Sequence, residues 1–229
     1  MLSDFRRLFR PQPARLVLLA GVGLFAFLLA ISPVRAEPPQ TVPALVESLQ
    51  GIETFAAGFE QRRLSARGEV TRESTGHFAI ARPDRFHWLY ETPYVQELTA
   101  RDGTLWVYEP DLRQATRSAL DARTAAPIAI LMGDRPIDDV FDIRPLDPAD
   151  GMAWFALRPK EEAGDFREVL LGLDDAGLRE MRFIDQLDQT THVLFDQRRF
   201  NQPVDPERFV FEPPEGVDVV EARQPPQMP

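Results

Sequence analysis

Cysteine is absent from all 229 residues of the sequence. This absence excludes disulfide bonds, thiolate metal sites and a cysteine nucleophile. It also excludes a lipid-modified cysteine after a signal segment, so we expect the processed chain to be soluble and not anchored to a membrane. An exported chain without disulfides must be stabilised by its hydrophobic core alone.

Catalytic and metal-binding motifs are also lacking. The three histidines, His77, His87 and His192, are far apart and form no HExxH or HxH pattern. The sequence has no GxSxG, P-loop or GxGxxG motif, and acidic pairs such as Asp138-Asp139 are typical of solvated turns. We therefore expect no catalytic site, no metal and no cofactor. An enzyme would have to assemble its site from residues without a local signature.

Basic residues are outnumbered by acidic ones. There are 26 Lys and Arg against 36 Asp and Glu, which gives a formal net charge of −10 at pH 7. This balance argues against a nucleic-acid partner, and anionic lipid surfaces should repel the chain. After residue 36 no apolar run is long enough to cross a bilayer.

Residues 1–36 have the pattern of a cleaved secretory signal. Four arginines precede an apolar run over 16–31, and small residues flank a cleavage position after Ala36. An uncleaved signal anchor is the alternative. Removing the five Arg and one Asp of this segment takes the net charge from −10 to −14 and leaves 193 residues. We expect residues 37–229 to form one domain with a proline-rich, flexible end at 222–229.

The processed chain is expected to be mainly β. Thr41 can cap a helix whose apolar residues recur every three or four positions as far as Ile52. From Phe55 onward a period of two predominates, and turn signals such as Asp102-Gly103 separate the strands. This is typical of an antiparallel meander curling toward a barrel. Strands are predicted at 55–64, 69–81, 85–91, 95–101, 105–109, 113–118, 140–145, 152–158, 166–173, 178–185 and 190–198, with a last one near 208–211 or 217–220.

The segment 121–136 interrupts the strand pattern. Thr124 and Pro127 suit the start of a short helix, and the helix is apolar on nearly every side through Ile128, Ile130, Leu131 and Met132. Such a helix must be buried on most sides, or lie against a surface that is sometimes empty. A second helical turn is expected at 136–140.

Aromatic residues crowd the predicted strand 85–91 and its neighbours. A two-residue turn at Asp102-Gly103 pairs Thr99 with Trp106, and a four-residue turn at 91–94 pairs Tyr90 with Val95. This register places on one face Phe86, Trp88, Tyr90, Val95, Trp106 and Tyr108. It places on the other face Arg85, His87, Leu89, Gln96, Leu98, Leu105 and Val107.

The register leaves two questions open. A slip of one residue would exchange the faces, so the residues alone do not decide which face lines a cavity. They also do not decide whether the aromatic face packs a closed core or binds an apolar guest.

Arg82 stands at the start of this strand, held extended by Pro83. An arginine keeps its charge, so beside an apolar face it needs carbonyl or carboxylate partners. The free carbonyls at the end of a short helix such as 125–132 would serve. A salt bridge at the surface is the alternative.

Three motifs carry a resemblance to a known family. "RPDRFHWLYETP", "DGTLWVYEPDLRQAT" and an apolar "TAAPIAILMG" occur in this order, between "LVESLQGIETFAAGFEQ" near the start and "FEPPEGVDVVE" near the end. Together with the signal segment they resemble the periplasmic outer-membrane lipoprotein carrier protein (LolA) family. The related receptor, LolB, shares the fold but carries a lipid-modified cysteine, which this sequence lacks. Ala81 departs from the family pattern, in which a longer residue is common.

The resemblance implies an incomplete antiparallel β-barrel with a lid of short helices over a hydrophobic cavity for acyl chains. Arg82 matches the arginine thought to bond the lid backbone and hold the empty form closed. The expected cavity residues are Phe86, Trp88, Tyr90, Trp106, Tyr108, Leu98, Ile128, Ile130, Leu131 and Met132.

The implied function is that of a soluble, monomeric periplasmic chaperone without catalytic activity. It would receive acylated lipoproteins from an inner-membrane lipoprotein-releasing ABC transporter and deliver them to an outer-membrane receptor similar to LolB. One alternative is another apolar-ligand or lipid-sensing envelope module with the same fold. An envelope hydrolase is a third hypothesis, which the missing motifs disfavour.

Overall fold

The computed structural model describes residues 38–120, 130–132, 136–161 and 166–222. All the described residues belong to one compact unit, residues 35–229. The predicted signal segment therefore lies outside the described residues, as do Ile128 and residues 223–229. No helix within the described ranges is both long and apolar enough to span a membrane.

Helix α1, Val42–Gln50, begins where the sequence predicts it. The Thr41 side chain accepts a hydrogen bond from the Ala44 N–H over 3.4 Å, which satisfies one of the free amides of the first turn. The helix ends at Gly51, whose N–H donates to the Glu47 carbonyl over 2.9 Å. Leu45 and Leu49, four residues apart, are buried on one face.

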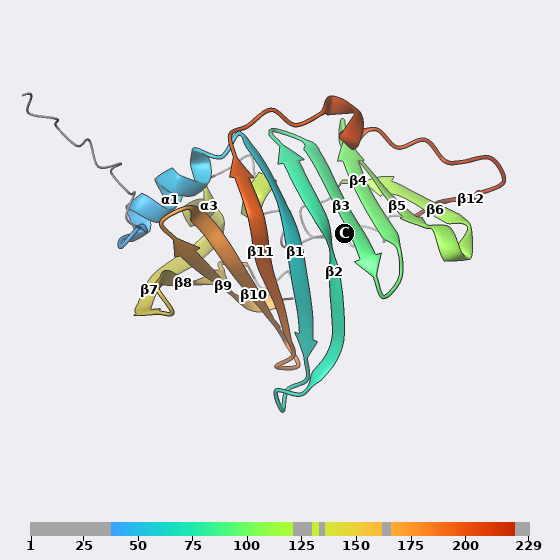
Figure 1. The fold of residues 1–229 in the computed structure, drawn as a ribbon. Coiled ribbons are helices and arrows are strands. Elements are labelled where there is room, and N and C mark those ends of the chain that lie inside the picture. The colour runs from blue at the N-terminus through green and yellow to red at the C-terminus, as the bar shows by residue number, and fades with distance from the viewer. Residues whose placement is uncertain (1–37, 121–129, 133–135, 162–165, 223–229) are drawn as a thin grey trace, which may run out of the picture. The chain divides into compact units, whose positions relative to one another are not determined.

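Twelve strands of the described part of the chain form a single open sheet in the order β12-β6-β5-β4-β3-β2-β1-β11-β10-β9-β8-β7 (Figure 1). All neighbouring strands pair antiparallel except β12 and β6, which are parallel. The mainly β, unclosed fold with short helices is confirmed. The strands are β1 Thr54–Leu64, β2 Val70–Ala81, β3 Arg85–Thr92, β4 Gln96–Arg101, β5 Thr104–Glu109, β6 Gln114–Ala119, β7 Phe141–Ala149, β8 Met152–Pro159, β9 Phe166–Asp174, β10 Gly177–Asp185, β11 Thr190–Phe200 and β12 Asp218–Glu221.

Two of the turns show why the strands could be predicted so closely. Asp102 and Gly103 have φ values of 50° and 72°, and Asp150 and Gly151 have 54° and 73°. Positive φ at both central residues matches the right-handed twist of the flanking strands, and Asp-Gly adopts it readily. These dipeptides therefore fix where β4 and β7 end and where β5 and β8 begin.

Alternation along the strands gives the sheet two different faces. We call the inner face the one whose side chains form the main hydrophobic cluster, and the outer face the opposite one. Strands β1, β2, β3 and β11 bring to the inner face a set of aromatic residues in mutual ring contact, with centroids 5.1 to 6.0 Å apart in the pairs that Phe78 makes. The buried inner-face aromatic residues from these strands are Phe55, Phe59, Phe78, Phe86, Trp88 and Phe195.

The remaining helices are short. The 3-10 helix η1 spans Pro110–Leu112, and α3 spans Ile137–Val140, which confirms the second helical turn predicted at 136–140. Residues 130–132 are helical as well. The 3-10 helix η2 spans Pro206–Phe209.

The segment after β11 covers the outer face. Phe209, only 1% exposed, packs with Ala56, Ala79 and Ala81 in a second hydrophobic cluster. A strand at 208–211 was one of two alternatives for the chain end and is wrong, because Asp205 accepts a hydrogen bond from the Glu207 N–H and starts a helical turn there. The other alternative, near 217–220, is confirmed by β12, which pairs with β6.

Candidate functional site

The aromatic residues of β3 lie on the inner face. Phe86 and Trp88 are 1% and 4% exposed, and Tyr90 packs partly buried against the same cluster. Trp88 lies opposite Leu98, and Tyr90 lies opposite Gln96, both of the adjoining strand β4. Leu98 therefore shares the inner face with Phe86, Trp88 and Tyr90, whereas the predicted register put it on the opposite face.

The predicted register between β3 and β4 is wrong by one residue. The connection between the paired residues holds five residues, 91–95, instead of four, so Tyr90 pairs with Gln96 and not with Val95. This register groups apolar side chains on the inner face, where Leu98 lies opposite Val107. Hydrophobic pattern sets strand register, and a shift of one residue moves a whole strand to the other face.

Trp106 and Tyr108 consequently lie on the outer face, which corrects their predicted place beside Trp88. The Asp102-Gly103 turn does pair Thr99 with Trp106, as predicted, but Thr99 itself faces outward. Both aromatic rings contact Phe211 of the C-terminal segment, with centroids 5.5 and 5.2 Å away. They therefore hold that segment to the sheet and lie on the face opposite the main cluster.

Residues 130–132, which we call the lid segment, pack against the main cluster. Ile130, Leu131 and Met132 are 4%, 0% and 7% exposed. The helix predicted at 125–132 lies outside the described residues as far as 129. Its three described residues are buried, which agrees with the first of the two alternatives, burial on most sides. Ile137 of α3 and Leu49 of α1 belong to the same cluster, so three helical segments contribute to it.

Arg82, directly after β2, bonds two of these segments. Its Nε–H donates to the Leu131 carbonyl over 2.9 Å, and its Nη1–H donates to the Gln50 carbonyl over 3.3 Å. Gln50 is the last residue of α1, where backbone oxygens lack intrahelical partners and a cation is favourable, and Leu131 is helical as well. The predicted bond from Arg82 to carbonyls of a short helix is therefore confirmed in place of the surface salt bridge. Burial lowers the pKa of the Arg82 guanidinium, which stays charged.

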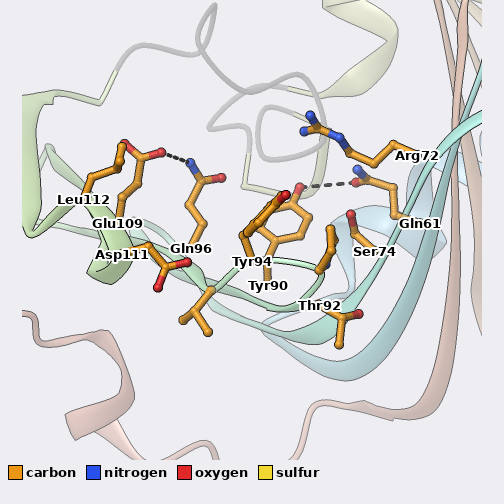
Figure 2. A pocket seen from close by; sticks show the side chains of 12 residues that line it. Gln61, Arg72, Ser74, Tyr90, Thr92, Tyr94, Gln96, Glu109, Asp111 and Leu112 are labelled. Carbon is orange, nitrogen blue, oxygen red and sulfur yellow. Dashed lines mark hydrogen bonds between the residues drawn. The ribbon is translucent and has the colours of Figure 1, made fainter.

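A pocket of about 500 Å³ opens where the inner face meets the β3–β4 hairpin, and we call it the rim pocket (Figure 2). Tyr90 joins it to the aromatic cluster, because its ring contacts Phe59 at 5.3 Å and Trp88 at 6.0 Å. The Tyr90 hydroxyl donates to Gln61 over 3.2 Å. The pocket is lined by Gln61, Arg72, Ser74, Tyr90, Thr92, Pro93, Tyr94, Val95, Gln96, Glu109, Asp111 and Leu112.

Neutral and charged polar groups both line the rim pocket. Burial raises the pKa of Tyr90 to about 12, although the Gln61 hydrogen bond and the charge of Arg72 act in the opposite direction. The hydroxyl is therefore a neutral donor at neutral pH. Across the pocket the Gln96 amide donates to Glu109 over 3.2 Å, as Figure 2 shows. The rim pocket is thus lined by both apolar and polar side chains.

Two elements of the site escaped the sequence prediction. Asn201 fixes the end of α1, because its amide donates to the Gly51 carbonyl over 2.7 Å and its oxygen accepts from the Glu53 N–H over 2.8 Å. No short-range pattern marks that contact across 150 residues. Gln61 was detectable in principle, since it breaks the apolar alternation that starts at Phe55.

The outer face carries a hydrogen-bonded group of three polar side chains, His87, Glu97 and Thr99. His87, predicted to point away from Phe86 and Trp88, accordingly lies outward and bonds Glu97 over 3.1 Å. Thr99 donates to the same carboxylate over 3.2 Å. The His87 hydrogen bond lowers the pKa of Glu97 below its ordinary value. Within the described ranges no three His, Asp or Glu side chains are grouped so that they could hold a metal ion.

Sequence comparison gives a consistent family match. The profile of the family described as "Outer membrane lipoprotein carrier protein LolA" matches residues 50–212. An outer-membrane lipoprotein carrier protein of Halorhodospira halophila is 40% identical over 199 residues, covering 86% of this chain and 92% of its own length. The protein of the same name from Methylococcus capsulatus is 38% identical over 189 residues, covering 81% of this chain and 91% of its own.

Comparison with solved structures supports the fold alone. An uncharacterized conserved protein from Thermus thermophilus superposes with a TM-score of 0.50 at 12% identity, covering 78% of this chain and 95% of that one. The open sheet with short helices is therefore an arrangement that distant sequences also adopt.

Proposed function

The chain belongs to the LolA family of outer-membrane lipoprotein carrier proteins, and from that premise we propose that it is a soluble periplasmic lipoprotein chaperone. It binds the acyl chains of lipoproteins released from the inner membrane and delivers them to an outer-membrane receptor. It acts as a monomer and has no catalytic activity. Residues 1–36 are its cleaved signal peptide, and residues 37–229 are the mature carrier domain.

One observation supports this proposal above the others. The lid segment buries Leu131 completely on an aromatic face, yet Arg82 provides a hydrogen bond that joins the segment to the sheet. A segment that covers an apolar surface and is joined to it by a removable polar contact can be displaced by another apolar occupant. The acyl chain and the lid segment would then compete for one surface.

Competition between the lid segment and the acyl chain explains how a tightly bound cargo can be released. Burying one CH₂ group is worth about 0.8 kcal/mol, so one chain of roughly 15 such groups gains about 12 kcal/mol. A carrier that recovered no free energy when its cargo left would bind that cargo almost irreversibly. Reburial of the lid segment recovers part of this free energy when the cargo leaves, and a ligand shifts a two-state protein only by its differential affinity.

The proposed acyl-chain site comprises the inner face and the residues that cover it. Arg82 is the lid-closing residue, which stabilises the empty form. Because Trp106 and Tyr108 lie on the outer face, we leave them out of the site. The acyl chains are proposed to contact Phe86, Trp88, Tyr90, Leu98, Ile130, Leu131 and Met132.

Two membrane partners complete the proposal. An inner-membrane lipoprotein-releasing ABC transporter would load the carrier, and a receptor similar to LolB would unload it. The net charge of −10 for the whole chain would discourage association with anionic membrane surfaces between the two encounters.

Copurification tests the proposal directly. Mature protein should copurify with an acylated lipoprotein and not with the same lipoprotein whose acylated cysteine is replaced by serine. Leu98→Glu, on the inner face, should reduce this binding, whereas Leu187→Glu, at a side chain 71% exposed, should not. Equal recovery of the acylated and unacylated lipoproteins would refute the proposal. Release of a lipoprotein from inner-membrane vesicles supplied with transporter and ATP tests the loading step.

A further inference from the structure

The indole N–H of Trp88 has no hydrogen-bond partner among the described residues. The side chain belongs to the main cluster and is 4% exposed, and its Nε1 is buried without an acceptor. Its ring lies among apolar neighbours, with centroids 4.7 Å from Phe59 and 5.1 Å from Phe78. The large majority of buried side-chain polar atoms in proteins have a partner, so this donor requires an explanation.

Two other aromatic side chains of the described residues, Trp154 and Tyr90, have partners for their polar atoms. A ring nitrogen of His87 and one of His192 lack a hydrogen bond, as Trp88 Nε1 does. Trp154, 5% exposed on the other side of the sheet, donates from Nε1 to the Ala149 carbonyl over 3.3 Å. Tyr90 donates to Gln61. A phenylalanine in place of Trp88 would occupy most of the same space without leaving a donor unpaired, since an unmet buried donor destabilises the folded state. The contacts of the described residues therefore do not account for an indole at this position.

The position of Trp88 relative to the rim pocket suggests what its partner is. Tyr90, two residues along β3 on the same face, lines the pocket and contacts the Trp88 ring at 6.0 Å. An apolar chain that enters from the pocket toward Phe59 and Phe78 passes Tyr90 first and then Trp88. A group near the head of that chain would come to rest beside these two residues.

The guest of the proposed function carries a suitable group. An acyl chain is joined to its polar head through a carbonyl, as an ester or an amide, and this oxygen is an acceptor without a donor of its own. When the hydrocarbon part is buried on the aromatic face, the carbonyl loses its water and needs a replacement donor. An indole N–H is a donor only, so the two groups are complementary.

We infer that Trp88 Nε1–H donates a hydrogen bond to an acyl carbonyl of the bound guest, and that the carrier thereby selects acyl chains over alkyl chains of equal length. This inference rests on the proposed function. The aromatic face supplies affinity in proportion to buried apolar area, which is nearly equal for an ester and an ether. Discrimination between the two must come from a polar group, and a site with an unpaired buried donor rejects the ligand that cannot satisfy it.

A matched pair of ligands tests the selection without altering the protein. The probes are a synthetic diacylglyceryl-cysteine peptide and its dialkyl ether analogue with the same chain length and peptide. In a competition assay against a fluorescent apolar dye, the wild-type mature protein should bind the ester about tenfold more tightly. Trp88→Phe should lower the affinity for the ester about tenfold and leave that for the ether unchanged. Trp106→Phe, on the outer face, should keep the wild-type ratio.

A spectroscopic readout separates a hydrogen bond from a packing effect. The sequence contains three tryptophans, so the indole N–H signals can be assigned in a ¹⁵N-labelled sample. The Trp88 signal should move downfield with the ester probe and not with the ether probe. This measurement uses the wild-type chain and stays decisive if Trp88→Phe does not fold.

The outcomes separate this inference from the proposed function. Equal affinities of wild-type protein for the two probes, or an ester preference that Trp88→Phe retains, would overturn the role of the indole while the carrier function stands. If neither probe binds to wild-type protein, the proposed function fails and the inference fails with it.

Discussion

Arg82 and Leu131 are joined by a hydrogen bond of 2.9 Å from the guanidinium Nε to the backbone carbonyl oxygen. The two residues are 49 positions apart, and the bond ties the end of β2 to the lid segment. Because the same guanidinium also reaches the Gln50 carbonyl of α1, one side chain holds two helical segments beside the inner face. The predictions below concern how these contacts, the two faces and the buried charges contribute to stability and function.

Replacement of Arg82 by leucine should loosen the lid segment. A hydrogen bond to a charged donor contributes about 1.5 kcal/mol or more, and about 1.4 kcal/mol corresponds to a tenfold change in an equilibrium. We therefore expect hydrogen exchange of the amides at 130–132 to become about tenfold faster. Cargo should still be accepted, but transfer to receptor-containing vesicles should be inefficient.

The control for this variant is Arg67→Leu, in the exposed turn between β1 and β2. It removes the same charge and should change neither hydrogen exchange at the lid segment nor transfer. Wild-type rates of transfer by Arg82→Leu would show that Arg82 does not control closure.

Phe209→Ala should destabilise the fold without affecting the proposed acyl-chain site. Phe209 is 1% exposed and covers small side chains of β1 and β2 on the outer face. Truncating a buried phenylalanine typically costs about 3 kcal/mol or more. The midpoint of urea unfolding should fall accordingly, while the folded protein keeps its affinity for an acylated peptide. Val210→Ala, at a neighbouring side chain 47% exposed, is the matched control and should change stability little. Loss of affinity in folded Phe209→Ala would show that the outer face contributes to binding.

Two glycine-to-alanine substitutions should differ in severity. At Gly76 an added Cβ would lie 1.9 Å from the Leu89 carbonyl oxygen, which is backbone in the paired strand β3. At Gly172 it would lie 2.9 Å from the Trp154 ring, whose side chain can shift. Overpacking by one methyl group usually costs about 1–3 kcal/mol where the surroundings can move. Gly172→Ala should fall in that range by urea unfolding, and Gly76→Ala should disrupt the β2–β3 pairing and yield little folded protein. Equal stability of the two variants would contradict this reading.

The sequence predicted the strands well because their signals are local. Alternation with a period of two and Asp-Gly turns depend on neighbouring residues, and β1 to β11 begin and end within a few positions of the predictions. The contact of Arg82 with a helical carbonyl was also predictable, since a charged side chain beside an apolar face has few possible partners.

The place of Trp106 could not be predicted in the same way. Its face depends on the number of residues in the loop before β4, and five residues instead of four move it from the face of Trp88 to the opposite one. Both faces of β3 to β5 carry apolar residues, because the C-terminal segment covers the outer face with Phe209 and Phe211. Because this part of the sheet is covered on both sides, it has no purely polar face, and the alternation in the sequence does not determine the register.

The rim pocket was missed for a related reason. Tyr94 and Leu112 reach it from the β3–β4 loop and from η1, and their places depend on how those loops fold over the sheet edge. Gln61 and Gln96 interrupt otherwise apolar positions of the inner face, which in retrospect marks where the apolar surface ends. Short-range patterns identify the elements, whereas the site depends on contacts among distant loops.

Acidification should weaken the fold through Asp174. Burial by itself would raise the pKa of this carboxyl, but hydrogen bonds from Arg198 and the Ala176 N–H and the charges of Arg198 and Arg179 hold the pKa below its usual value. The carboxylate and the guanidinium meet in two bonds of 2.9 and 2.6 Å, with the side chains 15% and 10% exposed. A carboxyl whose pKa is lower in the folded state adds stability that is complete above its unfolded pKa, about 3.9, and is lost as the pH falls through the folded pKa.

Asp174→Asn therefore separates the contribution of the Asp174 carboxylate to stability from that of the other carboxyl groups, in urea unfolding measured between about pH 7 and pH 3. At neutral pH the variant should be about 3 kcal/mol less stable, because Arg198 is left buried without its counter-ion. Below about pH 4 the difference from the wild type should shrink, since protonation removes the same carboxylate from the wild-type protein. Asp142→Asn, at an exposed residue of β7, should keep the wild-type pH profile. The slope that remains in Asp174→Asn should come from Glu97 and Glu180, whose pKa values are also lowered in the fold. A constant difference between the wild type and Asp174→Asn across the whole pH range would show that the ion pair does not stabilise the folded state through its charge.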